Sequence, residues 1–577
     1  MVLGLKRISK YIPLALAFLS FLYFLRILIQ YGDLLNPDDC AYVAFWKEMI
    51  RGDIYFEWTT PKPFEIILFG ILYQITHSLF IVALVFAVAM SLLVYYSSKV
   101  LIHISGNQIP CLFFTLFICT SPFFVDTVAT GGSGLVSSLL VIIALSEILT
   151  KKVFLQRLGN KFVIVFLSLS GLSRPENWIN AFLIIFCLYL LKYLRKQRGR
   201  IQYSDLFLLI PLLMPVAWHI FDYLAFGDLF YSTKMTVGYT ENVRDAFGWS
   251  DSFIWSDYPK RLKSFMFETL WLRVLLLSLV GLIWMLIKNR KSNRIVFLLL
   301  FCSFFGNIVF YFVTYIREMA LIGRFFFYNF VLIILLASVG AGGIVESVGW
   351  IFTKALRDTV RLTHRIFAKA KKTFPSIKDH YIESIRRLIR WVPLKAIIIF
   401  IQVGIVSTLI LFFIFIPLRK SLLPLFPGLK GQQTMRKLVE ESVRIIQADK
   451  DYSEDSFLLV IAEYEGRYCI LVPNKGSHVY PYRQLAALVE VPMFNKNLFY
   501  LMHFLTLNRQ KYVYRPVGML MDLKENIAFE KNIFYLVRMY PPRSDRIRMV
   551  IENLKKQAKS TETLIDRDNF KIYKLKE

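Results

Sequence analysis

Two adjacent carboxylates, Asp38 and Asp39, follow the first apolar segment of the chain. A carboxylate that is partly withdrawn from water has a raised pKa and can act as a general base on a hydroxyl group. The same two side chains offer the oxygen ligands that divalent metal ions prefer. Aspartate is also a favoured N-cap, so the pair can open a helix over residues 40–50. Taken alone, the pair does not decide between three roles: a general base, a metal site and a helix cap.

Three cationic residues, Lys62, Lys234 and Arg324, stand where apolar segments begin or end. Lys62 lies in a rigid turn between Pro61 and Pro63. Lysine and arginine side chains bind phosphate oxygens, but a cation near a bilayer also extends toward lipid headgroups. Contact with lipid explains each of the three taken singly. Their joint presence around one acidic pair predicts a site for an anionic group.

A charged pair, Arg174 and Glu176, interrupts an apolar region in the sequence GLSRPENW. Charged residues at membrane depth are costly, so they are usually paired or functional. This pair can hold a turn between two short helices, and it can also shape a substrate pocket. Asp126, at the start of the polar stretch 126–134, is a further candidate for the lining of that pocket.

The composition indicates a helical protein with many membrane spans. Of the 577 residues 56% are hydrophobic, 19% are charged and 52 are phenylalanine, and the mean hydropathy is +0.51. The net charge is +28, but the basic residues form short runs between apolar segments, as in cytoplasmic loops. We therefore expect membrane lipids and no nucleic acid as partners. No cysteine, histidine or nucleotide motif predicts a cofactor, so a divalent metal at Asp38 and Asp39 is the metal site left open.

The distribution of basic residues predicts which spans face which side. The basic N-terminus and the basic run 151–161 both belong in the cytoplasm, so an even number of crossings separates them. The apolar run 63–79 is therefore predicted to lie at the outer interface without crossing. The prediction is eleven spans, at 11–31, 80–102, 109–125, 134–150, 162–173, 178–191, 205–226, 271–287, 295–316, 325–345 and 396–417, with the N-terminus inside and the C-terminus outside.

This arrangement puts the polar stretches of interest on one side of a plasma or inner membrane. The outer face receives the first loop with its acidic pair, the stretch 126–134, the turn 173–178 and the loops 227–270 and 317–324. The region 346–395 holds twelve Lys or Arg against four acids, a net charge of +8, and is predicted to be cytoplasmic.

The composition changes after Pro417 to that of a soluble α/β domain. Segments 456–464, 467–473 and 532–540 are predicted strands, and segments 432–447, 497–508 and 543–558 are predicted amphipathic helices. We therefore divide the chain into a transmembrane catalytic module over 1–420 and an extracytoplasmic α/β domain over 421–577.

Protease treatment of the outer side of intact cells tests this sidedness. Trypsin added outside is expected to release the region after residue 420, because the predicted spans place that region on the outer face. A gel probed with antibodies against each end of the chain measures the cleavage. Protection of the C-terminal region, with cleavage restored only after the membrane is permeabilised, would show that the predicted number of spans is wrong.

Five motifs resemble, in order, those of the GT-C class of integral membrane glycosyltransferases, in particular bacterial arabinofuranosyl-, mannosyl- and aminoarabinose transferases. PDDCAYVAFWKEMIRGDIY followed by TTPKPFEIIL resembles their first outer loop, and TVATGGSGLVSSLL their outward turn after the third span. SRPENW resembles an Arg-Pro-Glu-Gly motif, with Asn177 in place of the glycine. FGDLFYSTKM resembles a Gly-Asp-x-x-x-x-Thr-x-x-Lys segment, and GRFFFYNFVLIILLA the Arg-aromatic start of a late span.

The resemblance implies a hexosyl- or pentosyltransferase that uses a polyprenyl-phosphate-linked sugar. Asp38 would be the base that activates the acceptor hydroxyl, with Asp39 positioning it. Lys62, Arg324 and Lys234 would stabilise the departing lipid phosphate. The acceptor would be a glycan, a lipid or a protein on the extracytoplasmic face.

Two other classes of protein fit parts of the same pattern. A transporter or flippase for lipid-linked glycans would bind the same phosphate and need no base, but such proteins usually show internal repeats and charges at the membrane midplane. A non-catalytic scaffold would use the C-terminal domain to recruit partners. The variant Asp38→Asn distinguishes the enzyme from the transporter and the scaffold. In the enzyme it should abolish sugar transfer while the lipid still binds.

Overall fold

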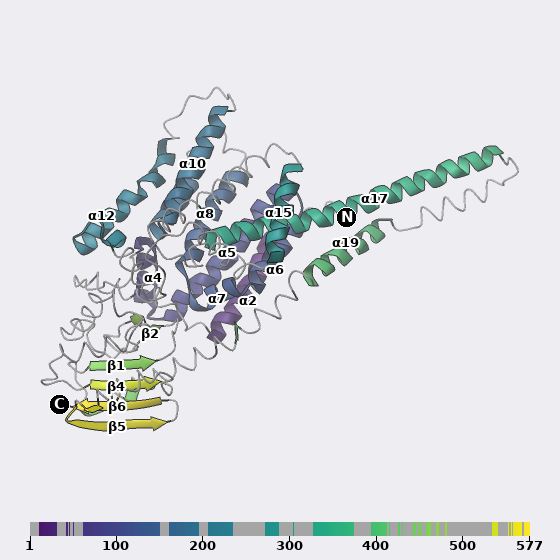
Figure 1. Cartoon of the computed structure of the whole chain (residues 1–577). Coiled ribbons are helices and arrows are strands. Elements are labelled where there is room, and N and C mark those ends of the chain that lie inside the picture. The colour runs from purple at the N-terminus through teal and green to yellow at the C-terminus, as the bar shows by residue number, and fades with distance from the viewer. Residues whose placement is uncertain are drawn as a thin grey trace, which may run out of the picture.

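The computed structural model describes the helices of the membrane region and the strands of the C-terminal region. The described residues are 11–31, 62–150, 161–194, 206–234, 272–287, 327–373 and 394–411, the strand segments after residue 456, and isolated positions between these ranges. The helices form a bundle, and the strands lie together beyond one end of it, the end where α4 and α7 are found (Figure 1).

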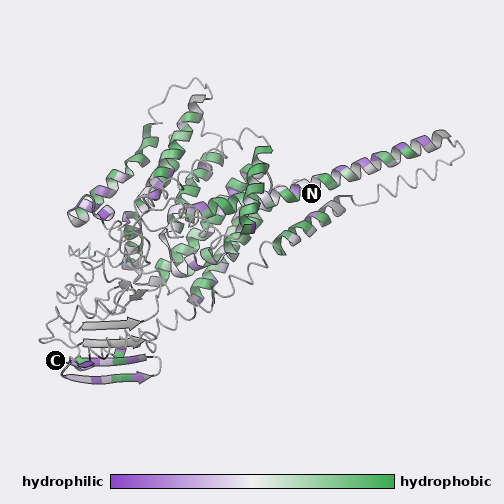
Figure 2. Cartoon of the chain, in the orientation of Figure 1, coloured by the Kyte–Doolittle hydropathy of each residue, from purple (hydrophilic) through white to green (hydrophobic). Residues whose placement is uncertain are grey.

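The bundle consists of apolar helices, whose backbone hydrogen bonds are satisfied within each helix, as the interior of a bilayer requires. Figure 2 shows hydrophobic residues along most of their length. The helices are α2 (Ile12–Tyr31), α4 (Pro63–Thr76), α5 (Leu79–Ser105), α6 (Ile109–Thr120), α7 (Pro122–Thr130), α8 (Ser133–Thr150), α9 (Lys161–Ser173), α10 (Glu176–Leu194), the 3₁₀ helix η2 (Phe207–Leu213), α12 (Met214–Phe226), α15 (Leu272–Ile287), α17 (Phe327–Thr373) and α19 (Leu394–Ile410).

Several of these helices are long enough to cross a membrane. Within the described residues four apolar stretches qualify, in α2, in α5, in η2 with α12, and in α17, and the bent pair of α6 and α7 makes a fifth. The other apolar helices are shorter, and the predicted span 295–316 falls outside the described residues apart from isolated positions. A multi-span helical fold is thus confirmed, while the total of eleven spans stays a prediction.

Two glycines bring α15 and α17 into direct backbone contact. A Cβ atom placed on Gly340 would lie 2.2 Å from the carbonyl oxygen of Leu277, and one on Gly281 would lie 1.9 Å from the carbonyl oxygen of Leu336. Small residues let helices approach closely where no hydrophobic effect drives them together in lipid. The contact holds α15 against the part of α17 that lies in the bundle, where most residues are buried.

The predicted span 109–125 is two helices. α6 ends at Thr120, α7 begins at Pro122, and the two are bent by 62°. Proline has no N–H with which to continue the hydrogen bonds of α6, and it disfavours the helical conformation at Ser121, which is extended with ψ of 123°. Because α7 continues to Thr130, Asp126 lies in a helix, and the prediction of an outward turn over 126–134 was wrong for this part.

α17 is longer than the span predicted from hydropathy. That span ended at residue 345, but the helix continues to Thr373 through the first half of the basic region. Beyond residue 350 the helix leaves the bundle, and hydrophilic residues alternate with hydrophobic ones along it (Figures 1 and 2). A basic loop was predicted there, because charge content does not distinguish a solvated loop from a solvated helix.

α4 is shorter than the apolar layer of a membrane is thick. Its 14 residues extend about 21 Å at 1.5 Å per residue, against about 30 Å for the apolar layer. It begins at Pro63, a residue suited to the first helical position, and ends at His77, whose φ of 51° stops the helix. A short helix at 63–76 agrees with the prediction that the run 63–79 does not cross.

The C-terminal strands form a mixed sheet. β1 (Phe457–Ala462) pairs in parallel with β4 (Phe534–Met539), and β6 (Phe570–Lys576) pairs antiparallel with β4 and with β5 (Ser560–Arg567). β2 (Cys469–Leu471) and β3 (Val479–Pro481) form a separate antiparallel pair. The three predicted strands are confirmed as β1, β2 and β4, while β3, β5 and β6 were not predicted. The predicted helices 432–447, 497–508 and 543–558 fall outside the described residues apart from isolated positions.

An ion-pair cluster at the end of the sheet predicts a specific acid sensitivity. The ammonium groups of Lys574 and Lys576 lie 2.6 Å and 2.5 Å from the carboxylate of Asp451, and hydrogen bonds from these two lysines lower the pKa of Asp451 to about 2. An aspartate with a depressed pKa stabilises the fold above its unfolded pKa of about 4, and this contribution is lost as the pH falls toward 2. Hydrogen exchange of β6, corrected for the intrinsic rate, should rise between pH 4 and pH 2. Asp451→Asn should remove that rise, and an unchanged pH profile would contradict the prediction.

Candidate functional site

The break between α9 and α10 buries a charged pair. α9 ends at Ser173, because Pro175 disfavours a helical conformation at Arg174 and cannot donate a backbone hydrogen bond. The Arg174 guanidinium donates from Nη2 to Glu176 Oε1 over 2.9 Å and from Nε over 3.2 Å. The two side chains are only 6% and 9% exposed. The pair predicted from GLSRPENW is therefore real, and it is shielded from solvent.

Side chains of α10 bond to the last carbonyls of α9. The Gly171 carbonyl cannot bond to Pro175, which lacks an N–H, whereas the Ser170 carbonyl also accepts from the Arg174 N–H. Asn177 Nδ2 donates to the carbonyl oxygen of Ser170 over 3.2 Å, and Trp178 Nε1 donates to that of Gly171 over 2.8 Å. Asn180 Nδ2 in turn donates to Asn177 Oδ1 over 2.8 Å. Buried carbonyls need such partners, so the turn is a fixed structure. Asn177, where the resembling motif has glycine, has a structural role here.

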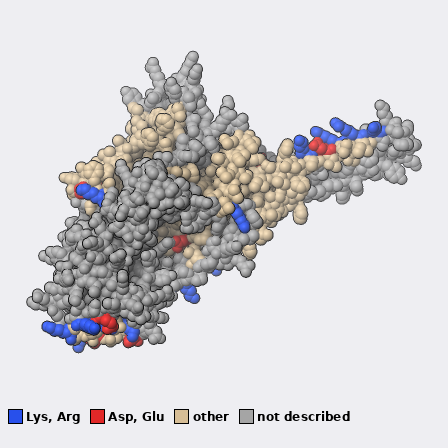
Figure 3. All heavy atoms as spheres, viewed as in Figure 1, with Lys and Arg blue, Asp and Glu red and all other residues tan. Residues whose placement is uncertain are grey.

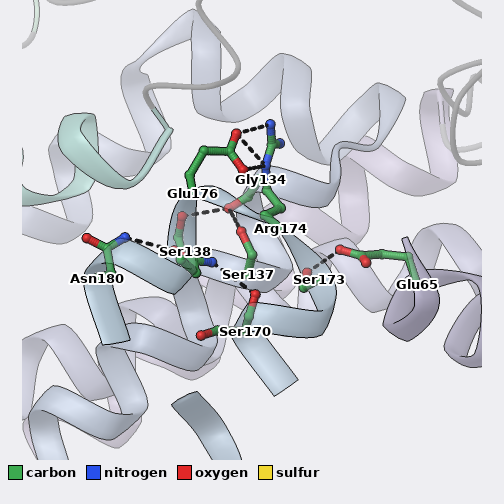
Figure 4. A network of polar contacts seen from close by, with 10 residues as sticks. Glu65, Gly134, Ser137, Ser138, Ser170, Ser173, Arg174, Glu176 and Asn180 are labelled. Carbon is green, nitrogen blue, oxygen red and sulfur yellow. Dashed lines mark hydrogen bonds and ion pairs between the residues drawn. The ribbon is translucent and has the colours of Figure 1, made fainter. Parts of the chain in front are cut away.

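Glu65 joins α4 to the same turn, and the sequence analysis did not single it out. Its side chain is fully buried, and Oε1 accepts a hydrogen bond from the hydroxyl of Ser173 (Figure 4). Its Oε2 atom has no hydrogen-bond partner within the described part of the chain. The signal for this residue was present in the sequence, since Glu65 is the one acid in the apolar run PFEIIL and lies one helical turn after Lys62.

Lys62 stands immediately before α4, and Glu65 lies in the first turn of the same helix. It is half-buried, and its ammonium group lies 5.3 Å from the centre of the Tyr42 ring. A cation over an aromatic face is held there by the quadrupole of the ring. Along the chain, the charged residues of α4 and of the α9–α10 break alternate in sign. They are Lys62, Glu65, Arg174 and Glu176.

The beginning of α8 completes this polar cluster. The carbonyl oxygen of Gly134 accepts hydrogen bonds from the hydroxyls of Ser137 and Ser138, at 3.1 Å and 2.6 Å. Figure 4 places this turn next to the Arg174–Glu176 pair. The predicted pocket residue Asp126 is half-buried on α7, and its carbonyl oxygen accepts a hydrogen bond from Thr130.

Lys234 lies on a segment that folds back onto α12. Asp222, which is buried, accepts hydrogen bonds from the backbone N–H and the hydroxyl of Ser232, and Trp218 Nε1 donates to the same hydroxyl over 2.9 Å. The Lys234 ammonium is 2.5 Å from Asp228, and its hydrogen bond lowers the pKa of that carboxyl. The lysine side chain is 68% exposed. The predicted phosphate ligand is therefore paired with an acid that the sequence analysis did not assign.

An aromatic contact connects this segment to the α9–α10 break. The rings of Trp178 and Trp218 lie edge to face with centroids 5.8 Å apart, and His219 packs against Trp178 with its Nδ1 2.8 Å from the carbonyl oxygen of Leu229. His219 therefore contacts both the ring of Trp178 and the backbone of the segment after α12.

Three predicted site residues, Asp38, Asp39 and Arg324, lie outside the described residues. The described residues contain no group of three or more His, Cys, Asp or Glu side chains that could hold a metal ion. Near Arg324 in sequence, Asn329 on the first turn of α17 is buried, and both polar atoms of its amide have no hydrogen-bond partner within the described part of the chain.

No protein-family model and no curated protein matches the chain. Two solved structures are similar over nearly their whole length: ArnT from Cupriavidus metallidurans bound to undecaprenyl phosphate, and the same protein in the apo state. Each is 12% identical with a TM-score of 0.47, and the alignments cover 100% and 99% of this chain and 98% of each ArnT chain. Because the likeness is distant, the function proposed below rests on the residues of this chain.

Proposed function

We propose that the chain is a membrane glycosyltransferase that transfers a sugar from a polyprenyl-phosphate donor to an acceptor hydroxyl on the extracytoplasmic face. The observation that carries the proposal is the polar cluster of the half-buried Lys62 with the buried Glu65, Ser173, Arg174 and Glu176. Buried charges in an apolar bundle are costly, so those that are present are usually paired or functional. α4, which begins directly after Lys62 and carries Glu65 in its first turn, lies at the end of the bundle beyond which the C-terminal sheet is found (Figure 1).

A donor that arrives through the bilayer suits an outward-facing site. Nucleotide sugars are made in the cytosol and do not cross lipid, whereas a lipid-linked sugar carries its phosphate at headgroup depth. Lys62 lies at the start of a short helix that does not cross the bundle, a position compatible with that depth. Its ammonium group and the guanidinium of Arg324 would bind this phosphate.

The proposed reaction is a single displacement at the anomeric carbon. Asp38 removes the proton from the acceptor hydroxyl, the acceptor oxygen forms a bond to the anomeric carbon, and the bond from that carbon to the phosphate oxygen breaks. Negative charge grows on the departing phosphate, and Lys62 and Arg324 stabilise it. Asp39 positions Asp38, and the Arg174–Glu176 pair shapes the pocket.

Variants of Asp38 and Lys62 test the proposed base and the proposed phosphate site independently. In nanodiscs with a radiolabelled polyprenyl-phosphate sugar and an extract containing acceptors, Asp38→Asn should lower turnover by about 10²–10⁴-fold, since general bases contribute that much. Native mass spectrometry should show undecaprenyl phosphate still bound. Lys62→Ala should instead weaken that binding about 10–100-fold, the value of a charge-assisted hydrogen bond.

The opposite results would favour other functions. Unchanged turnover in Asp38→Asn would remove the proposed base. A wild-type protein that binds the lipid and moves it across vesicles without transferring sugar would be a flippase. Undecaprenyl phosphate that binds Lys62→Ala and wild type equally would remove the proposed phosphate site.

A further inference from the structure

Two aromatic residues that precede α4 in the sequence, Tyr42 and Trp46, contact that helix. Both are helical positions four residues apart, so their side chains lie on the same side of their own helical turn. Trp46 Nε1 donates to Gln74 Oε1 over 2.9 Å. A Cβ atom on Gly70 would lie 2.0 Å from Cγ of Trp46. The indole therefore packs directly on the backbone of α4, at a position where only glycine leaves room for it.

α4 is attached to the bundle through other residues. Glu65 accepts a hydrogen bond from the hydroxyl of Ser173, and Phe69 lies edge to face with Phe86 of α5, with ring centroids 5.5 Å apart. At 3.6 residues per turn, these contacts use a different side of α4 from the side that receives Trp46. Trp46 is therefore not needed to attach α4, and its contact instead fixes Tyr42 relative to α4.

Lys62 returns this series of contacts to α4. Its ammonium group lies 5.3 Å from the centre of the Tyr42 ring, and Tyr42 is fully buried. A cation at this distance is attracted by the ring face, more strongly where water is excluded. A ring face takes only one side of an ammonium group, which has three N–H donors. The contact thus restricts a flexible side chain and is compatible with N–H donors aimed at an anion.

We infer that Tyr42 and Trp46 are positioning residues for Lys62. Tyr42 orders the ammonium group in the place where the donor phosphate binds, and Trp46 fixes Tyr42 through its contacts with Gly70 and Gln74. A group that is ordered before its ligand arrives loses less entropy on binding, so the phosphate binds more tightly. The inference rests on the proposed function, in which Lys62 binds the lipid phosphate.

The other explanation of these contacts is apolar packing alone. Packing depends on the shape of the ring, whereas attraction of a cation depends on the negative charge of the ring face. Fluorine atoms on a phenylalanine ring withdraw that charge and change the shape little. A fluorinated series at position 42 therefore separates the two explanations in the full chain.

Binding of undecaprenyl phosphate in nanodiscs, measured by native mass spectrometry, is the readout. Tyr42→Phe keeps the ring and should bind close to wild type. Phenylalanines with more ring fluorines at position 42 should bind progressively more weakly, by about 2–30-fold over the series. In a Lys62→Met background the same series should be flat, because two residues that act through one contact are not additive.

Gly70→Ala tests the part of the inference that concerns Trp46. The added methyl group displaces the indole, so binding should weaken by about 2–30-fold, as far as loss of the ordered cation allows. No weakening should follow in the Lys62→Met background, nor when Trp46→Ala has already removed the indole. Size-exclusion chromatography supplies the folded fraction of each variant on which binding is measured.

Trp350 and Lys354 provide a matched control. The Lys354 ammonium lies 5.2 Å from the centre of the Trp350 ring, a contact of the same kind at the point where α17 leaves the bundle. Figure 3 shows Lys and Arg side chains gathered along this outer part of α17, and Figure 1 shows α4 on the other side of the bundle. Trp350→Phe and its fluorinated forms should leave binding of undecaprenyl phosphate unchanged.

The contrary results are specific. A flat fluorinated series at position 42 in the wild-type background would mean that Tyr42 only packs. A series that still declines in Lys62→Met would mean that the ring does not act through Lys62. Wild-type binding by Gly70→Ala would remove the role of Trp46. A wild-type protein that binds the lipid but transfers no sugar would contradict the proposed function alone, since these measurements follow binding.

Discussion

Replacement of Arg174 by methionine is expected to lower the free energy of unfolding by about 3–5 kcal/mol, because it leaves the Glu176 carboxylate buried without its partner. The guanidinium binds that carboxylate through both Nε and Nη2, and neither side chain reaches solvent appreciably. A loss of this size is a large fraction of the stability of a typical domain. Thermal unfolding of the purified protein, followed by tryptophan fluorescence, measures it.

The double variant Arg174→Met with Glu176→Gln is the control for this expectation. Removing both charges avoids the unpaired carboxylate, so most of the lost stability should return. Arg174→Lys should recover only part of it, since an ammonium group cannot reproduce the planar fork of the guanidinium. If the single and double variants unfold at the same temperature, the pair does not stabilise the break between α9 and α10. A stable double variant would also show whether the pair affects binding of undecaprenyl phosphate apart from folding.

Gly340→Ala is expected to prevent stable folding, with a cost above about 3 kcal/mol from overpacking against backbone that cannot move aside. The added Cβ would lie 2.2 Å from the carbonyl oxygen of Leu277 and 2.8 Å from the backbone nitrogen of Gly281. Both of these are main-chain atoms of α15, so relief would require the two helices to separate. The yield of monodisperse protein after size-exclusion chromatography measures the effect.

Gly404→Ala provides a matched control in α19. It also replaces a helical glycine, but within the described part of the chain no atom lies within 4 Å of the position that the added Cβ would take. Alanine is favoured over glycine in a helix interior by about 1 kcal/mol, so this variant should fold as well as the wild type or better. Equal yields of Gly340→Ala and Gly404→Ala would mean that α15 and α17 do not touch as described.

Much of the fold could be predicted from local properties of the sequence. Apolar runs correctly marked α2, α5 and the start of α17, and strand-forming residues marked β1 and β4, because both patterns depend on neighbouring residues alone. β5 and β6 were missed. Their sequences, STETLIDR and FKIYKLK, are rich in polar and charged residues. β6 nevertheless buries Ile572 on one face of the sheet and Leu575 on the other, and its buried Lys574 is held by acids.

The site could be predicted only in part, since tertiary contacts decide it. The Arg174–Glu176 pair could be recognised because both residues lie in one motif. The bond between Glu65 and Ser173 joins residues 108 positions apart, and no local pattern indicates it. The pairing of Lys234 with Asp228 could have been predicted, because the two residues are only six positions apart in the sequence.

The 62° bend at Ser121 has a consequence for the bilayer around the protein. α6 and α7, with 12 and 9 residues, together advance only about 25 Å along the axis of α6 at 1.5 Å per residue. If this elbow turned back instead of crossing, three traverses would precede the basic run 151–161, which would then emerge outside against the usual preference. The predicted sidedness therefore requires the elbow to cross, and since it falls short of about 30 Å of hydrocarbon, we expect lipids to thin locally beside it.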